Sequence, residues 1–128
     1  MKQIDSDLFA ELKFDEEFTF EPRSASEIFS ISEDLVKKIW YDRHQVRRQM
    51  IEEGKLRIVP DAEWRAIAAR DTIKYSIWEG AKKSAAKVEK TFGKDNLGPW
   101  TKFEWGMLNG KVSALRWCLG FEWDMLDT

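Results

Sequence analysis

The sequence of 128 residues is poor in the groups that build metal centres and nucleophilic catalytic sites. It contains one cysteine, Cys118, and one histidine, His44. A single cysteine excludes an internal disulfide, and one thiol far from one imidazole predicts no metal site. Asp42 and His44 are two residues apart and point in different directions on a helix, which argues against a local dyad. We therefore expect no cofactor and no enzyme activity; the alternative is a small enzyme whose site is assembled from distant residues.

Long apolar runs are missing as well. No window holds the roughly 18 or more apolar residues of a membrane span, and the first residues, MKQIDSDLF, lack the basic and apolar regions of a signal peptide. We therefore expect a cytoplasmic protein without membrane contact. Hydrophobic residues make up 43% of the chain, with seven Trp and eight Phe, so this tryptophan-rich sequence is expected to form a packed core.

The strongest local signals predict a helix at about 102–119. Thr101 and Glu104 match a capping box, in which each side chain binds the exposed backbone N–H of the other residue. Gly120 can adopt the left-handed conformation that ends a helix. The alternative is a β-hairpin, because Asn109-Gly110 is a strong turn signal between apolar flanks.

This helix carries two apolar stripes, which predict that most of its circumference is buried inside a bundle. One stripe comprises Trp105, Leu108, Val112, Leu115 and Leu119, and the other comprises Phe103, Met107, Ala114, Trp117 and Cys118. Gly106, Gly110 and Ala114 recur every four residues and favour a close neighbour, either a packed helix of the same chain or a bound partner. The aromatic segment after Gly120 is expected to fold back and bury Trp123 and Leu126; the alternative is that it forms an exposed docking patch.

Periodicity upstream predicts a long helix from about 33 to 53, a short helix capped by Asp61, and a further helix from Asp71 to Gly93. Residues 55–59 have an extended pattern, and their only regular partner in the sequence is the run 18–20, which suggests a minor two-stranded β patch. The prediction is thus a mainly α protein. A compact bundle of three to four helices, with a buried C-terminal helix, forms a single domain at 24–128 behind an acidic aromatic arm at 1–23.

Charge is strongly segregated along the chain, although the net charge is only −2. Residues 1–34 carry a net −7, residues 35–102 a net +7 and residues 103–128 a net −2. The arm interleaves its acids with Phe14, Phe18 and Phe20. Two interpretations stay open: the arm folds onto the basic middle of its own chain, or it presents an acidic surface that imitates nucleic acid or engages a basic protein.

Two sets of cationic side chains lie at helical spacing in the basic middle. Tyr41, His44 and Arg48 follow one face of the first long helix, where an aromatic among cations can contact a protein or a phosphate. A lysine ridge on the next helix is the most nucleic-acid-like feature of the chain, although such ridges are usually solvated. Together with arginines of the first helix, the candidate nucleic-acid residues are Arg43, Arg47, Arg48, Lys83, Lys87, Lys90 and Lys94.

The C-terminal segment GPWTKFEWGMLNGKVSALRWCLGFEWDMLDT, with IWYDRH and IWEGAKK upstream, resembles a pattern shared by small bacterial and phage proteins of unknown function. The resemblance covers the last quarter of the chain well, the middle loosely and the acidic arm not at all. It implies a prokaryotic or viral source and no particular activity, cofactor or site residue.

These observations favour a non-enzymatic module that binds another protein, such as a phage or mobile-element regulator or inhibitor. The residues expected to bind that partner are Phe14, Phe18, Phe20, Tyr41, His44 and Arg48. Nucleic-acid binding through the lysine and arginine residues is the first alternative. A homodimer that covers its excess aromatic side chains against a second copy is another.

Overall fold

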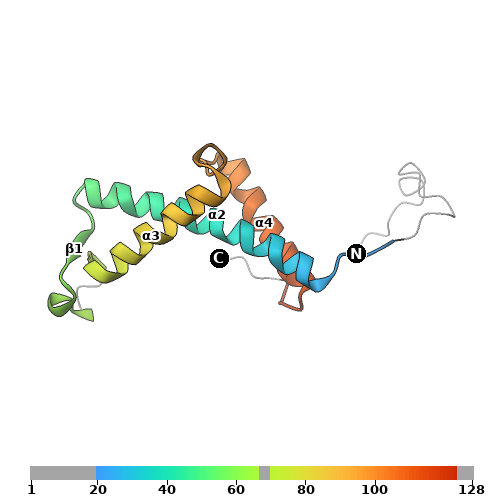
Figure 1. Ribbon diagram of the computed structural model, residues 1–128, viewed down its shortest axis with the longest axis horizontal. Coiled ribbons are helices and arrows are strands. Elements are labelled where there is room, and N and C mark those ends of the chain that lie inside the picture. Colours follow the sequence, from blue (N-terminus) through green and yellow to red (C-terminus); the bar gives the residue numbers. More distant parts are fainter. Residues whose placement is uncertain (1–19, 67–69, 124–128) are drawn as a thin grey trace.

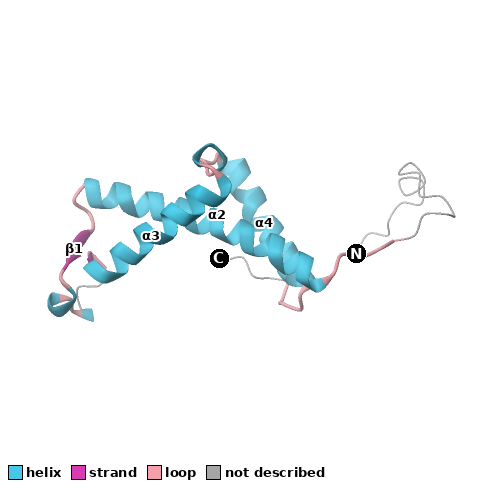
Figure 2. Cartoon of the chain, in the orientation of Figure 1, coloured by secondary structure: helices cyan, strands magenta, loops and turns pink. Residues whose placement is uncertain are grey.

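A single long helix, α2 (Ala25–Glu52), is the centre of the computed structural model, which describes residues 20–66 and 70–123. Helices α3 (Tyr75–Phe92) and α4 (Lys102–Cys118) both pack along α2 (Figure 1). α3 runs beside its C-terminal half and α4 beside its N-terminal half. Coloured by secondary structure, the described chain is dominated by these three helices (Figure 2), which confirms the predicted mainly α fold.

Helix α2 begins earlier than its periodicity suggested. The Oγ of Ser24 accepts a hydrogen bond from the backbone N–H of Glu27 at 3.2 Å and caps the helix. The expected start near residue 33 is therefore wrong. The Ser24 cap satisfies the exposed backbone groups, and no Gly or Pro follows it to interrupt the helix before Gly54.

Helix α4 has the boundaries and the cap that were predicted. The N–H of Glu104 donates to Thr101 Oγ1 at 3.1 Å, and the N–H of Thr101 donates to Glu104 Oε1 at 3.0 Å. Gly120, with φ of 99°, follows the end of the helix. The hairpin alternative is wrong, because Asn109 lies within α4 and its side-chain amide donates to the carbonyl of Trp105 at 2.8 Å.

The small sheet is present but pairs different segments from those expected. Strand β1 (Arg57–Val59) lies parallel to β2 (Thr72–Lys74), with Ile58 opposite Ile73. The predicted pairing of residues 55–59 with the run 18–20 is wrong at Phe20, because Phe20 is exposed and does not belong to a strand. Residues 18 and 19 lie outside the described residues. Helix α3 consequently starts at Tyr75 rather than at Asp71, because the intervening residues form β2.

Asp61 stabilises the start of α3 from a distance instead of capping a helix of its own. It begins a single 3-10 turn, Asp61–Glu63. Its carboxylate accepts hydrogen bonds from both the backbone N–H, at 3.0 Å, and the hydroxyl of Ser76. These hydrogen bonds lower the pKa of Asp61. Lys74 provides no side-chain cap for α3. The exposed backbone N–H of Ser76, in the first turn, instead donates to Asp61, a residue 15 positions upstream.

Two separate apolar clusters hold the helices together, and α2 contributes to both. Toward α4, Ile39 packs with Leu108 and Val112. Toward α3, Tyr41 packs with a second set of buried residues. That second set comprises Ala85, Val88 and Leu97, with Trp40 and Phe92 packed against it. The predicted inner stripe of α4 is therefore confirmed, and its contacts are made with α2.

The expectation that both apolar stripes of the C-terminal helix are covered is corrected by the exposure of its second stripe. Phe103 is 77%, Met107 46% and Trp117 55% exposed. Cys118 is exposed as well, contrary to expectation, and so is Trp123, whose burial was the first of two interpretations; Leu126 lies outside the described residues. The reason is that, among the described elements, α4 packs chiefly on α2 and along one face, so that α2 takes the central position expected for α4.

This assignment of faces predicts a contrast between two neighbouring residues of α4. Leu108→Ala removes a buried side chain between α2 and α4 and is expected to lower the free energy of unfolding by about 2–4 kcal/mol. Met107→Ala alters the exposed stripe and is expected to change it by about 0.5 kcal/mol or less. Urea unfolding followed by circular dichroism measures both. Equal losses would show that α4 is buried on both faces.

Candidate functional site

The only histidine lies in an aromatic sandwich between α2 and α3. Its imidazole stacks on Trp40, with ring centroids 5.2 Å apart, and on Trp78, at 4.9 Å. Only 3% of the surface of His44 is exposed, and among the described residues its Nε2 has no hydrogen-bond partner. The imidazolium ion would place a charged N–H where these residues offer no acceptor. Burial, together with the nearby Arg48 and Arg47, therefore lowers the pKa of His44.

Tyr41 is buried one turn before the histidine, with 4% of its surface exposed. Its hydroxyl donates a hydrogen bond to Glu89 Oε1 on α3 at 2.8 Å. Burial, that hydrogen bond and the charge of Glu89 raise the pKa of Tyr41 to about 12. Lys94 Nζ lies 3.8 Å from the other carboxylate oxygen of Glu89. The arrangement ties α2 to α3 through a neutral phenol that donates to a carboxylate.

The exposed aromatic and cationic face predicted on α2 is therefore not formed. Tyr41 and His44 are core residues, and of the three residues placed on that face only Arg48 is exposed. The correction has a simple physical cause: α3 packs against this side of α2 and covers both rings. Phe20 is exposed, while Phe14 and Phe18 lie outside the described residues. Contact of these residues with a partner stays a prediction.

The cationic residues proposed for nucleic acid lie at the surface of α2 and α3, except Lys94, which begins the 3-10 turn Lys94–Asn96 after α3 has ended. All seven are exposed: Arg43, Arg47, Arg48, Lys83, Lys87, Lys90 and Lys94. Carboxylates accompany part of the ridge, since Lys94 lies near Glu89 and Lys82 pairs with Glu79 at 2.7 Å. Nucleic-acid binding stays a prediction, and so does an enzyme site assembled from distant residues.

Two classes of feature are not found in the part of the chain that the structure describes. Within residues 20–66 and 70–123, no group of three or more His, Cys, Asp or Glu side chains is placed to hold a metal ion. No helix in these ranges is both long and apolar enough to cross a membrane.

The exposed stripe of α4 is the most distinctive surface described. Its aromatic side chains lie opposite Leu108 and Val112, which face α2. The stripe continues past the end of the helix, where the ring of Trp123 makes an edge contact with Trp117 at 5.7 Å between centroids. The spacing was visible in the sequence, but the sequence did not show which of the two stripes would be left uncovered.

Comparison of the chain with protein-family models, curated proteins and solved structures finds no significant match.

One half of the aromatic sandwich had a signal in the sequence. Trp40 and His44 are four residues apart, so that they lie over each other on one helical face. Trp78 belongs to another helix, 34 residues further on by the numbering, and no local pattern connects it with His44.

The histidine sandwich predicts a dependence of stability on pH. The folded state holds the pKa of His44 below its usual 6.5, whereas the unfolded chain does not. As the pH falls below 6.5, the unfolded chain binds the proton first, and the free energy of unfolding decreases. The urea midpoint is therefore expected to fall between pH 7.5 and 5, before most carboxylates titrate.

His44→Phe keeps an aromatic ring between the two tryptophans and removes the titrating group. Because the chain has no other histidine, this variant should lose most of the slope between pH 7.5 and 5. An unchanged slope in His44→Phe would contradict the assignment.

Proposed function

We propose that this protein binds a helix of another protein through the outer face of α4, which comprises Phe103, Met107, Gly110, Ala114 and Trp117. The observation that carries the proposal is the exposure of its three large side chains, 46–77% of each, on the side of the helix that faces away from α2. Clustered exposed aromatic side chains are typical of the residues that dominate the binding energy of protein interfaces.

The spacing of the outer face favours a helical partner. Its residues follow one another at intervals of four, three, four and three, which is the pattern of a seam between two helices. In such a seam, the apolar side chains of an amphipathic partner helix insert between the side chains of the outer face.

Two glycines on α4 support close approach of that partner. Gly106 and Gly110 have no positive φ, and a Cβ placed on either would meet nothing within 4 Å. Neither backbone geometry nor packing within the described chain therefore requires glycine. Glycine inside a helix costs about 1 kcal/mol relative to alanine, so two of them reduce the intrinsic stability of α4. Close approach of a partner backbone to this surface would account for glycine at both positions.

Charge indicates which kind of helix fits. Three of the four charged side chains of α4 are cations: Lys102, Lys111 and Arg116. The single carboxylate, Glu104, already accepts the hydrogen bond of Thr101 in the capping box. An amphipathic helix with acidic residues beside its apolar stripe would complement this surface. A bacterial or phage regulator or inhibitor would act in this way, since the role requires a specific interface and no catalytic group.

The proposal predicts a selective loss of binding in a matched pair of variants. Trp117→Asp places a charge in the outer face and is expected to reduce capture of a helical protein partner from a prokaryotic lysate at least tenfold. Val46→Asp introduces the same charge at an apolar position of α2 that is 52% exposed, and it should retain capture. Immobilised chains and quantitative mass spectrometry of the bound proteins measure the ratio.

Equal capture by Trp117→Asp and the unmodified chain would refute the proposal. Light scattering on the purified protein separates the homodimer alternative. A dimer that Trp117→Asp dissociates would show that a second copy occupies the outer face in place of another protein.

The glycine argument has its own prediction. Gly110→Ala is expected to raise the free energy of unfolding by about 0.5–1 kcal/mol, because alanine favours the helix and finds open space at this position. The same variant should bind the partner more weakly, since the added methyl group keeps the two backbones apart. Urea unfolding tests the first part; a loss of stability would show that the glycine is required by the chain's own fold.

A further inference from the structure

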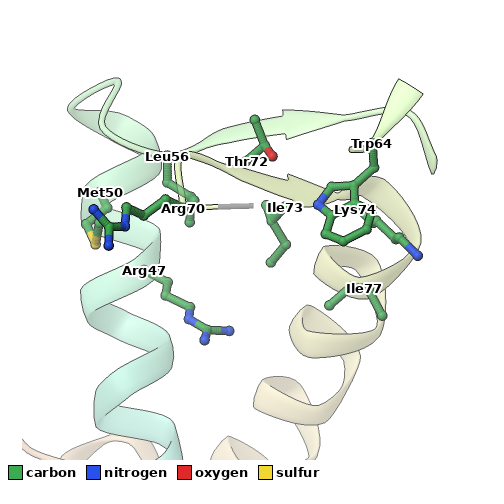
Figure 3. Close-up of a pocket in the computed structure, with 9 residues that line it drawn as sticks. All are labelled: Arg47, Met50, Leu56, Trp64, Arg70, Thr72, Ile73, Lys74 and Ile77. Atoms are coloured by element: carbon green, nitrogen blue, oxygen red, sulfur yellow. The ribbon is translucent and has the colours of Figure 1, made fainter. Parts of the chain in front are cut away.

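A basic hollow lies near the C-terminal end of α2. It has a volume of about 440 Å³ and lies between α2 and α3 beneath the two-stranded sheet (Figure 3). A volume of this order accommodates a small molecule or a few side chains of a peptide. None of its lining residues belongs to α4, so it is separate from the outer face of that helix.

Three cations from different segments line the hollow, and none of its described lining residues is a carboxylate. They are Arg47 on α2, Arg70 before the sheet and Lys74 at the end of β2. No described carboxylate forms an ion pair with any of the three. The ammonium of Lys74 lies 4.7 Å above the ring of Trp64, which leaves the two guanidinium groups as the principal sites for an anion. Guanidinium groups bind a carboxylate with two parallel hydrogen bonds.

The remainder of the lining is largely apolar. In Figure 3, Ile73 and Ile77 extend into the space between the helices, and Leu56 lies at the base of the sheet. A bare phosphate would place its charged oxygens against these hydrocarbon groups, which is unfavourable. A ligand that fits carries a carboxylate next to an aromatic or aliphatic group.

The position of the sheet favours a peptide as the carrier of that group. Among the described residues the sheet has two strands, so β2, which lines the hollow, has one side that is not joined to a third strand. An extended peptide can place its backbone along a strand edge and its alternate side chains in an adjacent pocket.

From these observations we infer that the basic hollow is a binding site for an acidic peptide segment with an apolar side chain beside its carboxylates. The guanidinium groups of Arg47 and Arg70 hold the carboxylates, and the surface formed by Leu56, Ile73 and Ile77 receives the apolar side chain. Trp64, held by the ammonium of Lys74, closes one side. This site does not depend on the function proposed for α4, because the two surfaces share no residue.

The test uses a blocked peptide, acetyl-Asp-Ser-Asp-Leu-Phe-amide, titrated into the full-length chain. Its sequence is that of residues 5–9 of this protein, which have the required chemistry. Backbone amide NMR should show saturable shifts at Trp64, Ile73 and Ile77. Two matched peptides, Asn-Ser-Asn-Leu-Phe and Asp-Ser-Asp-Ala-Ala, lack the carboxylates or the apolar side chains. Each should bind about tenfold or more weakly, since each loses one half of the contacts.

Matched variants distinguish specific binding in the hollow from general attraction between the acidic peptide and the basic surface. Arg47→Gln with Arg70→Gln is expected to weaken peptide binding about tenfold, whereas Lys83→Gln with Lys90→Gln removes the same two charges on α3 and should change it less than about twofold. All four residues are exposed, so folding should be preserved. Equal weakening by both pairs, or shifts centred on α4, would overturn the site.

The chain's own residues 5–9 can compete with the added peptide, and one further variant resolves this. If Asp5→Asn with Asp7→Asn makes the added peptide bind more tightly than it binds the unmodified chain, the site is supported and its resident occupant is the protein's own N-terminal segment. Absence of saturable binding to both chains would overturn the inference.

Discussion

Helix α2 is buried on two sides at once, and the rest of the structure depends on this double packing. Ile39 faces the cluster shared with α4, and Tyr41, two residues later, faces the cluster shared with α3. α4 gains its tertiary contacts chiefly from α2, α3 divides its contacts between α2 and the two-stranded sheet, and α3 and α4 contribute little to each other. Since a helix packed against one neighbour buries one stripe, the second apolar stripe of α4 is left at the surface.

The same packing determines which chemical groups are available outside. The single histidine and the phenol of Tyr41 are enclosed between α2 and α3, where they join the helices through ring stacking and a hydrogen bond to Glu89. Their altered pKa values therefore concern stability. The exposed chemistry is of two other kinds: an apolar helical face on α4, and cations around an apolar hollow near the C-terminal end of α2.

These two surfaces differ in the partner chemistry that they select. The outer face of α4 offers aromatic side chains with a few flanking cations, which suits an amphipathic helix. The basic hollow offers guanidinium groups above hydrocarbon, which suits an acidic segment in an extended conformation. They lie beside different halves of α2 and use different residues, so occupation of one does not obstruct the other. The proposed protein binding would account for features that the stability of the isolated chain does not require, above all Gly106 and Gly110 in α4.

The sequence by itself determined where α4 begins and ends and where α3 ends. Caps and glycine stops are local: Thr101 and Glu104 satisfy each other within three residues, and Gly93 and Gly120 need only their own backbone conformation. Only the tertiary structure decided that β1 pairs with β2, that His44 lies against Trp78, and that α2, and not α4, occupies the centre. Each of these depends on contacts between segments far apart in the chain, and two stripes of equal hydrophobicity do not reveal which of them a distant helix will cover.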